Sequence, residues 1–287
     1  MKSANDLNEK TLAQAWTDLQ EHAAIGLPLG ADAYRLAFAD PEFLLRRETR
    51  GIRFQLEMLK PDLEQQAQGI ENTIVVFGSA RFNSIEASQK QLEAAQASND
   101  QDALLAAQRT LRNAKYYDLA RQFGTIVARY SEHLAPADRL YICTGGGPGI
   151  MEAANRGAHD VGAPTLGLNI ALPHEQSANA YVTPSLSFKF HYFAARKMHF
   201  MMRAKAMVAF PGGFGTLDEL FEVMTLVQTK KASPIPIILF GSDYWKRLIN
   251  FDVLVEEGAV SPEDLSLFKT TDSPEEAWDF IRQFYKL

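Results

Sequence analysis

The segment Ala206–Glu219 reads AMVAFPGGFGTLDE and decides how this part of the chain folds. Its first five residues, Ala206–Phe210, have the composition and length of a short buried strand. The glycine-rich turn leads into Leu217–Gln228, where apolar residues recur at helical spacing. A strand, a glycine-rich turn and a helix start form an anion site, because glycines admit a phosphate and the first helical amides are free donors. We therefore expect a phosphate cradle with an acid, Glu219, one turn into the helix.

Strand-like and helix-like segments alternate along most of the chain, which predicts a parallel sheet with right-handed crossovers and helices on both faces. The fold class expected is thus α/β, with a doubly wound sheet. The expected strands cover residues 73–79, 139–143, 165–170, 185–190, 206–210, 235–240 and 267–271. The expected helices cover residues 116–131, 150–161, 192–205, 217–228, 244–257 and 274–284.

The first 70 residues lack convincing strands and predict an N-terminal helical extension, followed by a catalytic domain over residues 71–287. One helix is expected over Pro41–Lys60. Its expected inward side chains are Phe43, Leu44, Ile52, Leu56 and Leu59. Residues 84–112 are rich in Ala, Gln, Glu and Lys and predict a polar helical hairpin that breaks near Asn99. A solvated insertion is favoured over a partner surface for this hairpin.

The composition is that of a soluble globular protein, with 46% hydrophobic and 22% charged residues. No apolar run is long enough for a membrane span, and the polar start does not resemble a secretion signal. A lone cysteine, Cys143, fits a reducing cytoplasm. The net charge of −6 argues against a nucleic acid polymer as partner, whereas a small anion needs only a local positive site. We expect a cytoplasmic protein that binds no membrane and no nucleic acid polymer.

Three turns follow expected strands and should meet at one crevice, because ligands of parallel sheets bind beyond the carboxyl ends of the strands. These turns are Gly78–Arg81, Gly145–Gly149 and Gly212–Gly215. The residues expected to contact a ligand there are Gly78, Ser79, Gly146, Gly147, Gly212, Gly213, Gly215 and Thr216.

Several common motifs are absent. Ile150 occupies the last position where a dinucleotide-binding G-x-G-x-x-G would need glycine. No P-loop and no G-x-S-x-G nucleophile turn occurs. The six histidines show no metal-binding spacing, so no metal site is expected. Cys143 is interpreted as a buried strand residue rather than a nucleophile.

The adjacent cations Arg196 and Lys197 precede the Ala206 strand on an expected helix that is otherwise largely apolar. A functional role is favoured over a solvated basic patch, because arginine offers a planar fork for a phosphate or a carboxylate. Arg203 and Lys205 are expected at the surface.

Glu219 and Glu222 are three residues apart and share a helical face. One or both could simply complement the helix dipole, and Asp218 is assigned to that role. Glu219 is the better functional candidate, since the glycine turn would hold it near the ligand.

These residues resemble the "lonely guy" (LOG) family, whose members were long labelled lysine decarboxylases. Pro211–Glu219 matches the family motif PGGxGTxxE, and Gly145–Met151 resembles its first glycine loop with one residue fewer. Arg196-Lys197 resembles the family's Arg-Lys pair, at the same separation of 23 residues from Glu219, and Thr225 also aligns. The resemblance covers roughly residues 72–251.

The resemblance implies a Rossmann-like homodimer that hydrolyses the N-glycosidic bond of a nucleoside 5′-monophosphate to a free base and ribose 5-phosphate. Family substrates are cytokinin nucleotides or ordinary purine and pyrimidine nucleotides such as AMP. No cofactor and no metal are required. By position, the resemblance makes Arg196 and Glu219 catalytic. It places in the substrate site Lys197, Gly213, Gly215, Thr216 and Thr225.

Cleavage of a ribosyl C–N bond develops positive charge on the sugar, which the Glu219 carboxylate would stabilise while it activates water. Arg196 would position Glu219 and hold the ligand. The alternative is a non-catalytic nucleotide sensor or carrier that uses the same cradle. A pyridoxal phosphate-dependent decarboxylase would need a dedicated lysine, and no residue of the sequence indicates one.

Overall fold

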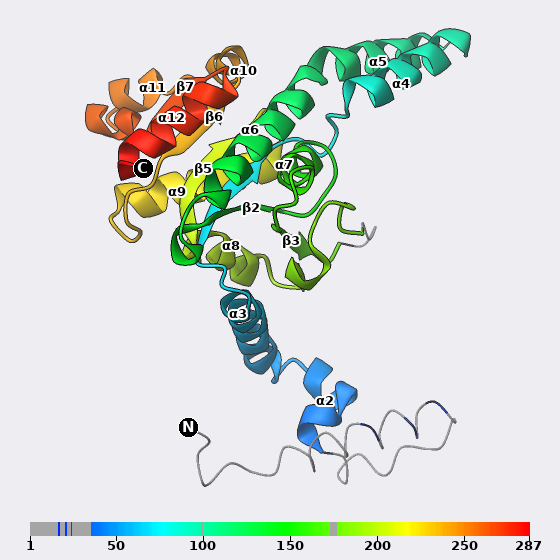
Figure 1. Ribbon diagram of the computed structural model, residues 1–287, viewed down its shortest axis with the longest axis vertical. Coiled ribbons are helices and arrows are strands. Elements are labelled where there is room, and N and C mark those ends of the chain that lie inside the picture. Colours follow the sequence, from blue (N-terminus) through cyan, green and yellow to red (C-terminus); the bar gives the residue numbers. More distant parts are fainter. Residues whose placement is uncertain (1–16, 18–20, 22–23, 25–35, 99, 173–176) are drawn as a thin grey trace. The chain divides into compact units, whose positions relative to one another are not determined.

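The computed structural model describes residues 17, 21, 24, 36–98, 100–172 and 177–287. The chain divides into two compact units, Met1–Glu57 and Met58–Leu287, and all strands belong to the second unit (Figure 1). The division into domains at residue 70 stays a prediction.

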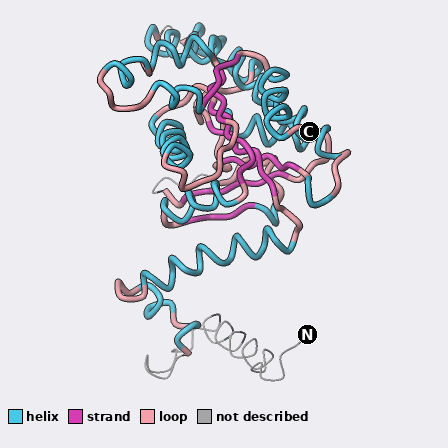
Figure 2. The backbone as a smooth tube through the Cα atoms, turned by 90° about the vertical axis from the view of Figure 1, so that its left-hand side faces the viewer, coloured by secondary structure: helices cyan, strands magenta, loops and turns pink. Residues whose placement is uncertain are grey.

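Seven parallel strands form one sheet in the order β4-β3-β2-β1-β5-β6-β7. Figure 2 shows the strands in magenta with helices around them. The order grows outward from β1 in both directions, which is the doubly wound arrangement expected from the alternation of strands and helices. The strands are β1 (Asn72–Phe77), β2 (Leu140–Thr144), β3 (Thr165–Ile170), β4 (Ser187–Phe190), β5 (Ala204–Ala209), β6 (Ile237–Phe240) and β7 (Phe268–Thr271). The α/β fold class is thereby confirmed.

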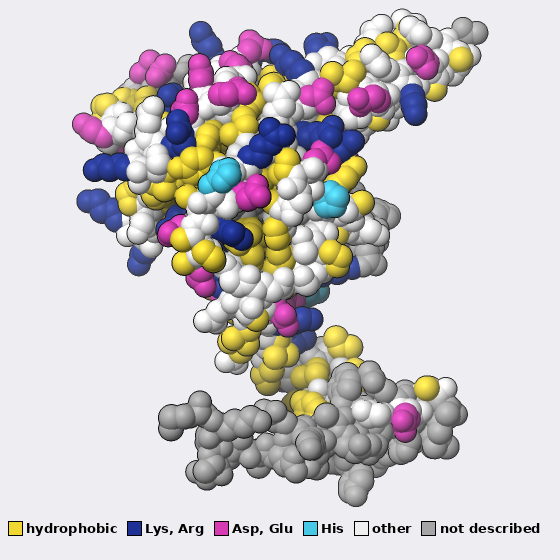
Figure 3. Space-filling view, in the orientation of Figure 1, with side chains coloured by type: hydrophobic (Ala, Val, Ile, Leu, Met, Phe, Trp, Pro, Cys, Tyr) yellow, Lys and Arg dark blue, Asp and Glu magenta, His cyan; other side chains and the backbone are white. Residues whose placement is uncertain are grey.

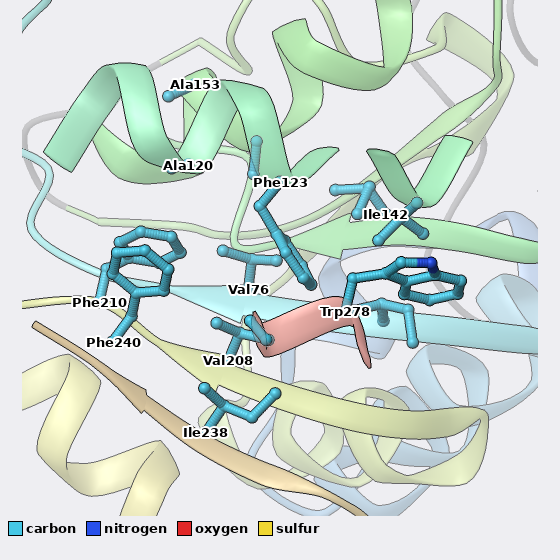
Figure 4. Packing of buried hydrophobic residues seen from close by; sticks show 14 of the residues in the cluster. Val76, Ala120, Phe123, Ile142, Ala153, Val208, Phe210, Ile238, Phe240 and Trp278 are labelled. Carbon is cyan, nitrogen blue, oxygen red and sulfur yellow. The ribbon is translucent and has the colours of Figure 1, made fainter. Parts of the chain in front are cut away.

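Helices cover both faces of the sheet. One face packs against α6 (Lys115–Glu132), α7 (Ile150–His159) and α12 (Pro274–Tyr285), and its core includes Val76, Phe123 and Trp278 (Figure 4). The other face meets α8 (Phe193–Met202) and α9 (Phe214–Gln228), where the rings of Phe77 and Phe200 lie 4.7 Å apart. Successive strand residues point to opposite faces, so Val76 enters one core while Phe77 enters the other.

The polar segment 84–112 forms two helices, α4 (Ile85–Ala97) and α5 (Gln101–Asn113), which pack against each other and project from the sheet (Figure 1). Asp100 ends the turn between them by accepting hydrogen bonds from the amides of Asp102 and Ala103. Few side chains of either helix are buried, in keeping with a solvated hairpin.

Several expected boundaries are wrong. The helix expected over 41–60 is two helices, α2 (Pro41–Leu45) and α3 (Arg50–Ala67), because the Thr49 hydroxyl donates to the carbonyls that end α2. The expected inward positions Ile52, Leu56 and Leu59 are each about half exposed. The helix expected over 244–257 is likewise two, α10 (Ser242–Leu248) and α11 (Asp252–Glu256).

The surface expectation for Arg203 is also wrong. Its side chain is only 10% exposed and its Nη1 lies 2.7 Å from Asp62 Oδ1. Its Nε donates to the Ile70 carbonyl at 2.8 Å. Arg203 therefore ties the end of α8 to the residues that precede β1.

Acidic and basic side chains are interspersed on the face drawn in Figure 3. Among the described residues, no helix combines the length and the apolar character needed to cross a bilayer.

Candidate functional site

A cavity of about 680 Å³ opens at the carboxyl ends of β1 and β5, the edge of the sheet at which the sequence places its glycine turns. Five segments supply its walls: the turn after β1, the first turn of α7, the helix α8, the glycine turn with α9, and α10. The lining residues include Gly78, Ser79, Phe193, Arg196, Gly212, Gly213, Phe214, Gly215, Thr216, Glu219 and Tyr244.

The helix α9 begins three residues earlier than expected, at Phe214, with Gly213 as its N-cap. Leu217 is the first residue whose amide donates within the helix, to the Gly213 carbonyl at 3.1 Å. The amides of Phe214, Gly215 and Thr216 precede it at the positive end of the helix dipole. These donors line the cavity, so the structure places the predicted cradle at its wall.

Position 212 requires glycine, because the Thr216 side chain lies too close to leave room for a Cβ. A Cβ at this position would lie 2.1 Å from Thr216 Oγ1, whereas Gly213 and Gly215 face open space. The buried Thr216 side chain therefore packs directly against the backbone of the turn at Gly212.

Arg196 and Glu219 are buried side by side, 9% and 5% exposed. Arg196 Nη1 lies 3.7 Å from Glu219 Oε1, and Arg196 Nε donates to the Leu168 carbonyl at 2.7 Å. The guanidinium also lies over the ring of Phe200, 5.1 Å from its centre. The arginine is thus fixed by the Leu168 carbonyl, the ring of Phe200 and the Glu219 carboxylate.

Burial raises the pKa of Glu219 to about 7, although Arg196 and Lys197 act in the opposite direction. Burial also lowers the pKa of Arg196, an effect that the Glu219 charge opposes. The attraction between the two charges therefore only partly offsets the effect of burial, and Glu219 exchanges its proton near neutral pH. A carboxyl group with this property is suited to acid–base chemistry.

The first glycine turn contacts Arg196 and Asn179. A Cβ on Gly145 would lie 2.5 Å from Arg196 Nη2, so this glycine makes room for the guanidinium. Gly146 accepts from the Asn179 amide at 2.8 Å, and Gly147 accepts from Asn179 Nδ2 at 3.0 Å. Gly146 and Gly147 do not line the cavity, so their direct contact with a ligand stays a prediction.

Lys197 points to the other side of α9. Its Nζ lies 2.7 Å from Asp218 Oδ1 and 3.0 Å from Glu222 Oε2. Burial alone lowers the pKa of Lys197, but the hydrogen bonds to Asp218 and Glu222 raise it above its ordinary value. Asp218 is in the second turn of α9, so its assignment to the helix dipole is wrong and its partner is this lysine.

The predicted substrate-binding residues thus divide into three groups. Gly78, Ser79, Gly212, Gly213, Gly215 and Thr216 line the main cavity. Lys197, Glu222 and Thr225 line a neighbouring groove along α9, where the Thr225 hydroxyl donates to the Phe221 carbonyl. Gly146 and Gly147 lie in the network of Asn179.

Several cavity residues were not among the predicted site residues, and three of them present aromatic rings or a hydroxyl to the site. Phe193 and Phe214 present rings that are 51% and 91% exposed. The Tyr244 hydroxyl donates to the Gly212 carbonyl. The position of Phe214 inside the glycine motif was the only signal available in the sequence, since Tyr244 lies 32 residues from Gly212 and reaches it only through the fold.

Other reactive groups in the described chain offer no competing centre. Burial raises the pKa of Cys143 to about 12, so the thiol stays protonated. No three His, Cys, Asp or Glu side chains within the described ranges are grouped as metal ligands would be.

The fold and the cavity define a Rossmann-type α/β protein in which a glycine-capped helix start adjoins a buried arginine–glutamate pair. Residues 151–281 match the family described as "Possible lysine decarboxylase". The chain is 31% identical over 155 residues to the rice "Probable cytokinin riboside 5'-monophosphate phosphoribohydrolase LOG4", covering 53% of this chain and 66% of that protein. It is 33% identical over 122 residues to the Arabidopsis thaliana "Cytokinin riboside 5'-monophosphate phosphoribohydrolase LOG3", covering 41% of this chain and 55% of that protein.

The comparisons bear out the expected resemblance of this chain to the LOG family. The chain spans between about half and two thirds of the length of these relatives. Among solved structures, the Moco carrier protein from Chlamydomonas reinhardtii is similar at 18% identity, with a TM-score of 0.45, over 76% of this chain and 99% of that one.

Proposed function

We propose that this protein hydrolyses the N-glycosidic bond of a nucleoside 5′-monophosphate, releasing the base and ribose 5-phosphate. The observation that carries the proposal is the buried Glu219, whose pKa is raised to about 7 and whose carboxylate lies 3.7 Å from Arg196 beside the free amides of α9. The activities named for the LOG relatives support the same reaction class.

The 5′-phosphate binds to the amides of Phe214, Gly215 and Thr216, where backbone donors and the helix dipole both favour an anion. Glu219 follows five residues after Phe214, a rise of roughly 7 Å along the helix, which a ribose 5-phosphate can bridge. Phosphate binding therefore brings the anomeric carbon toward the carboxylate, and remote binding energy orients the reacting bond.

Glu219 in its ionised form stabilises the positive charge that develops on the sugar as the C–N bond breaks. The bonding electron pair leaves with the base nitrogen. A water molecule adds to the anomeric carbon and gives one proton to Glu219, and a proton taken up by the base completes the balance. Arg196 positions the carboxylate through their contact and holds part of its charge in the ionised state.

Phe193 and Phe214 offer a place for the base. Both rings line the cavity and remain largely exposed. A planar base would cover exposed aromatic faces by stacking on them. The base thus lies toward these rings while the phosphate lies on the amides.

The geometry does not favour a lysine-dependent decarboxylase, despite the description of the family match. A Schiff-base lysine is activated by a lowered pKa. Lys197 has a raised pKa, is held by Asp218 and Glu222, and does not line the cavity.

The test is a panel of nucleoside 5′-monophosphates, including cytokinin nucleotides and AMP, with detection of free base and ribose 5-phosphate. Glu219→Gln and Arg196→Ala should abolish turnover, and dephosphorylated nucleosides should be poor substrates. Glu152→Gln is the matched control. The Glu152 carboxylate accepts a hydrogen bond from the Tyr117 hydroxyl at 2.7 Å, and Glu152 does not line the cavity. Binding of nucleotides by the wild-type protein without any product would contradict the proposal and leave a nucleotide carrier.

A further inference from the structure

One peptide unit of the glycine turn joins Gly212 to Gly213. Neither flanking residue has a side chain, and Gly213 faces open space. Within the described chain, the Gly213 amide donates to no backbone carbonyl. A peptide flanked by two glycines can adopt either of two opposite orientations at little steric cost.

The orientation of this peptide decides the charge that it presents. Its carbonyl oxygen and its amide hydrogen lie on opposite sides of a trans peptide plane, and the described chain contains no cis peptide. A carbonyl turned toward the anion site would repel a phosphate, whereas an amide on that side would bind it.

Tyr244 restrains this peptide from the neighbouring helix α10. Its hydroxyl donates to the Gly212 carbonyl and its side chain lines the cavity. The start of α10 is itself fixed, since the Ser242 amide donates to Asp272 Oδ1 at 3.0 Å and the Trp245 indole donates to the Phe240 carbonyl at 3.0 Å. Tyr244 is therefore anchored outside the glycine turn, on a helix start that is hydrogen-bonded to its surroundings.

We propose that Tyr244 is a positioning residue, whose hydroxyl fixes the Gly212–Gly213 peptide with its carbonyl held away from the bound phosphate and its amide available to it. The inference rests on the proposed function only in taking a phosphate group as the ligand of the turn. Burial raises the pKa of Tyr244, so the hydroxyl keeps its proton and remains a donor at neutral and moderately alkaline pH.

The variant that isolates the hydroxyl is Tyr244→Phe, which keeps the ring. The matched control is Tyr285→Phe, because the Tyr285 hydroxyl also donates to a backbone carbonyl, that of Lys205 at 2.7 Å, and does not line the cavity. Binding of inorganic phosphate, ribose 5-phosphate and free adenine is measured by isothermal titration calorimetry on the full-length chain. This readout does not depend on turnover.

Tyr244→Phe should weaken binding of inorganic phosphate and ribose 5-phosphate by roughly tenfold, because the released peptide no longer holds the Gly213 amide toward the charged phosphate. Adenine binding should be unchanged, and Tyr285→Phe should behave as the wild type toward all three ligands. If nucleotides bind but are not hydrolysed, the proposed function fails while this inference still stands on the phosphate data. Equal phosphate affinity in Tyr244→Phe and wild type would overturn the inference, as would equal weakening of adenine and phosphate, which would indicate a general loss of structure.

Discussion

Glu219 should make the folded protein less stable as the pH rises through neutrality. The carboxyl group has a pKa of about 7 when folded against an ordinary value of 4.5, because burial disfavours its charged form. The folded protein therefore binds this proton more tightly than the unfolded chain does. Stability from this group is fully present below pH 4.5 and is lost as the pH rises to about 7.

The magnitude follows from the same values. One unit of pKa corresponds to about 1.4 kcal/mol, so the full difference between the folded and the unfolded carboxyl is about 3 kcal/mol. Between pH 5 and pH 8, on the order of 2 kcal/mol of this is lost from the free energy of unfolding. In Glu219→Gln this loss is absent, because an amide does not ionise.

The assay is urea unfolding of the wild type and Glu219→Gln at several pH values between 5 and 8. Titration of all other groups is shared by the two proteins and cancels in the difference. The loss of a partner for Arg196 offsets the difference by an amount that does not vary over this range. The free energy of unfolding of Glu219→Gln should rise relative to that of the wild type as the pH rises. In a thermal melt, the same change corresponds to roughly 5 °C in melting temperature. Two parallel pH profiles would refute the raised pKa and with it the proposed acid–base role.

Three further changes test other parts of the site. Gly145→Ala should lower turnover by about tenfold or more with little effect on melting temperature, because its Cβ would displace the Arg196 guanidinium; normal kcat would count against this placement. Phe214→Ala should raise KM for nucleotides by about tenfold and leave inhibition by ribose 5-phosphate unchanged, since only the base stacks on the ring; equal loss for both ligands would contradict it. Lys197→Met should lower the free energy of unfolding by about 1 kcal/mol in urea titrations, since it leaves two partly exposed acids of α9 without a cation; an unchanged midpoint would show that the cluster contributes nothing.

The order and type of the elements could be predicted from the sequence because each strand is a short apolar run between helical patterns. The strand Thr165–Ile170 has the expected bounds, and most other elements differ by a few residues at their ends. The start of α9 was missed because apolar periodicity begins at Leu217, whereas the helix begins at Phe214 through its backbone geometry. Apolar spacing also could not show the breaks after α2 and α10, which depend on local hydrogen bonds and turns.

The site was harder to predict than the fold. The sequence indicated Arg196 and Glu219 as functional candidates, and the structure brings them together as a buried pair. The partners of Lys197 and Asp218 could not be seen, because they join two helices that the sequence treats as separate patterns. Tyr244 could not be predicted as a site residue for the same reason. Its contact with Gly212 forms only because β6, which precedes Tyr244, lies beside β5, which precedes Gly212.

The two glycine turns make different contributions to one electrostatic arrangement. The turn before α9 exposes backbone donors to the cavity, and any phosphorylated ligand could use them. The turn after β2 makes room at Gly145 for a buried guanidinium, whose charge opposes the rise that burial causes in the pKa of Glu219. A protein that merely held a phosphate would gain nothing from burying Glu219, because the acid destabilises the fold above pH 4.5 and repels the ligand. The cost of this carboxyl group is therefore the strongest structural argument that the cavity carries out a reaction, and Arg196 is the residue that makes that cost tolerable.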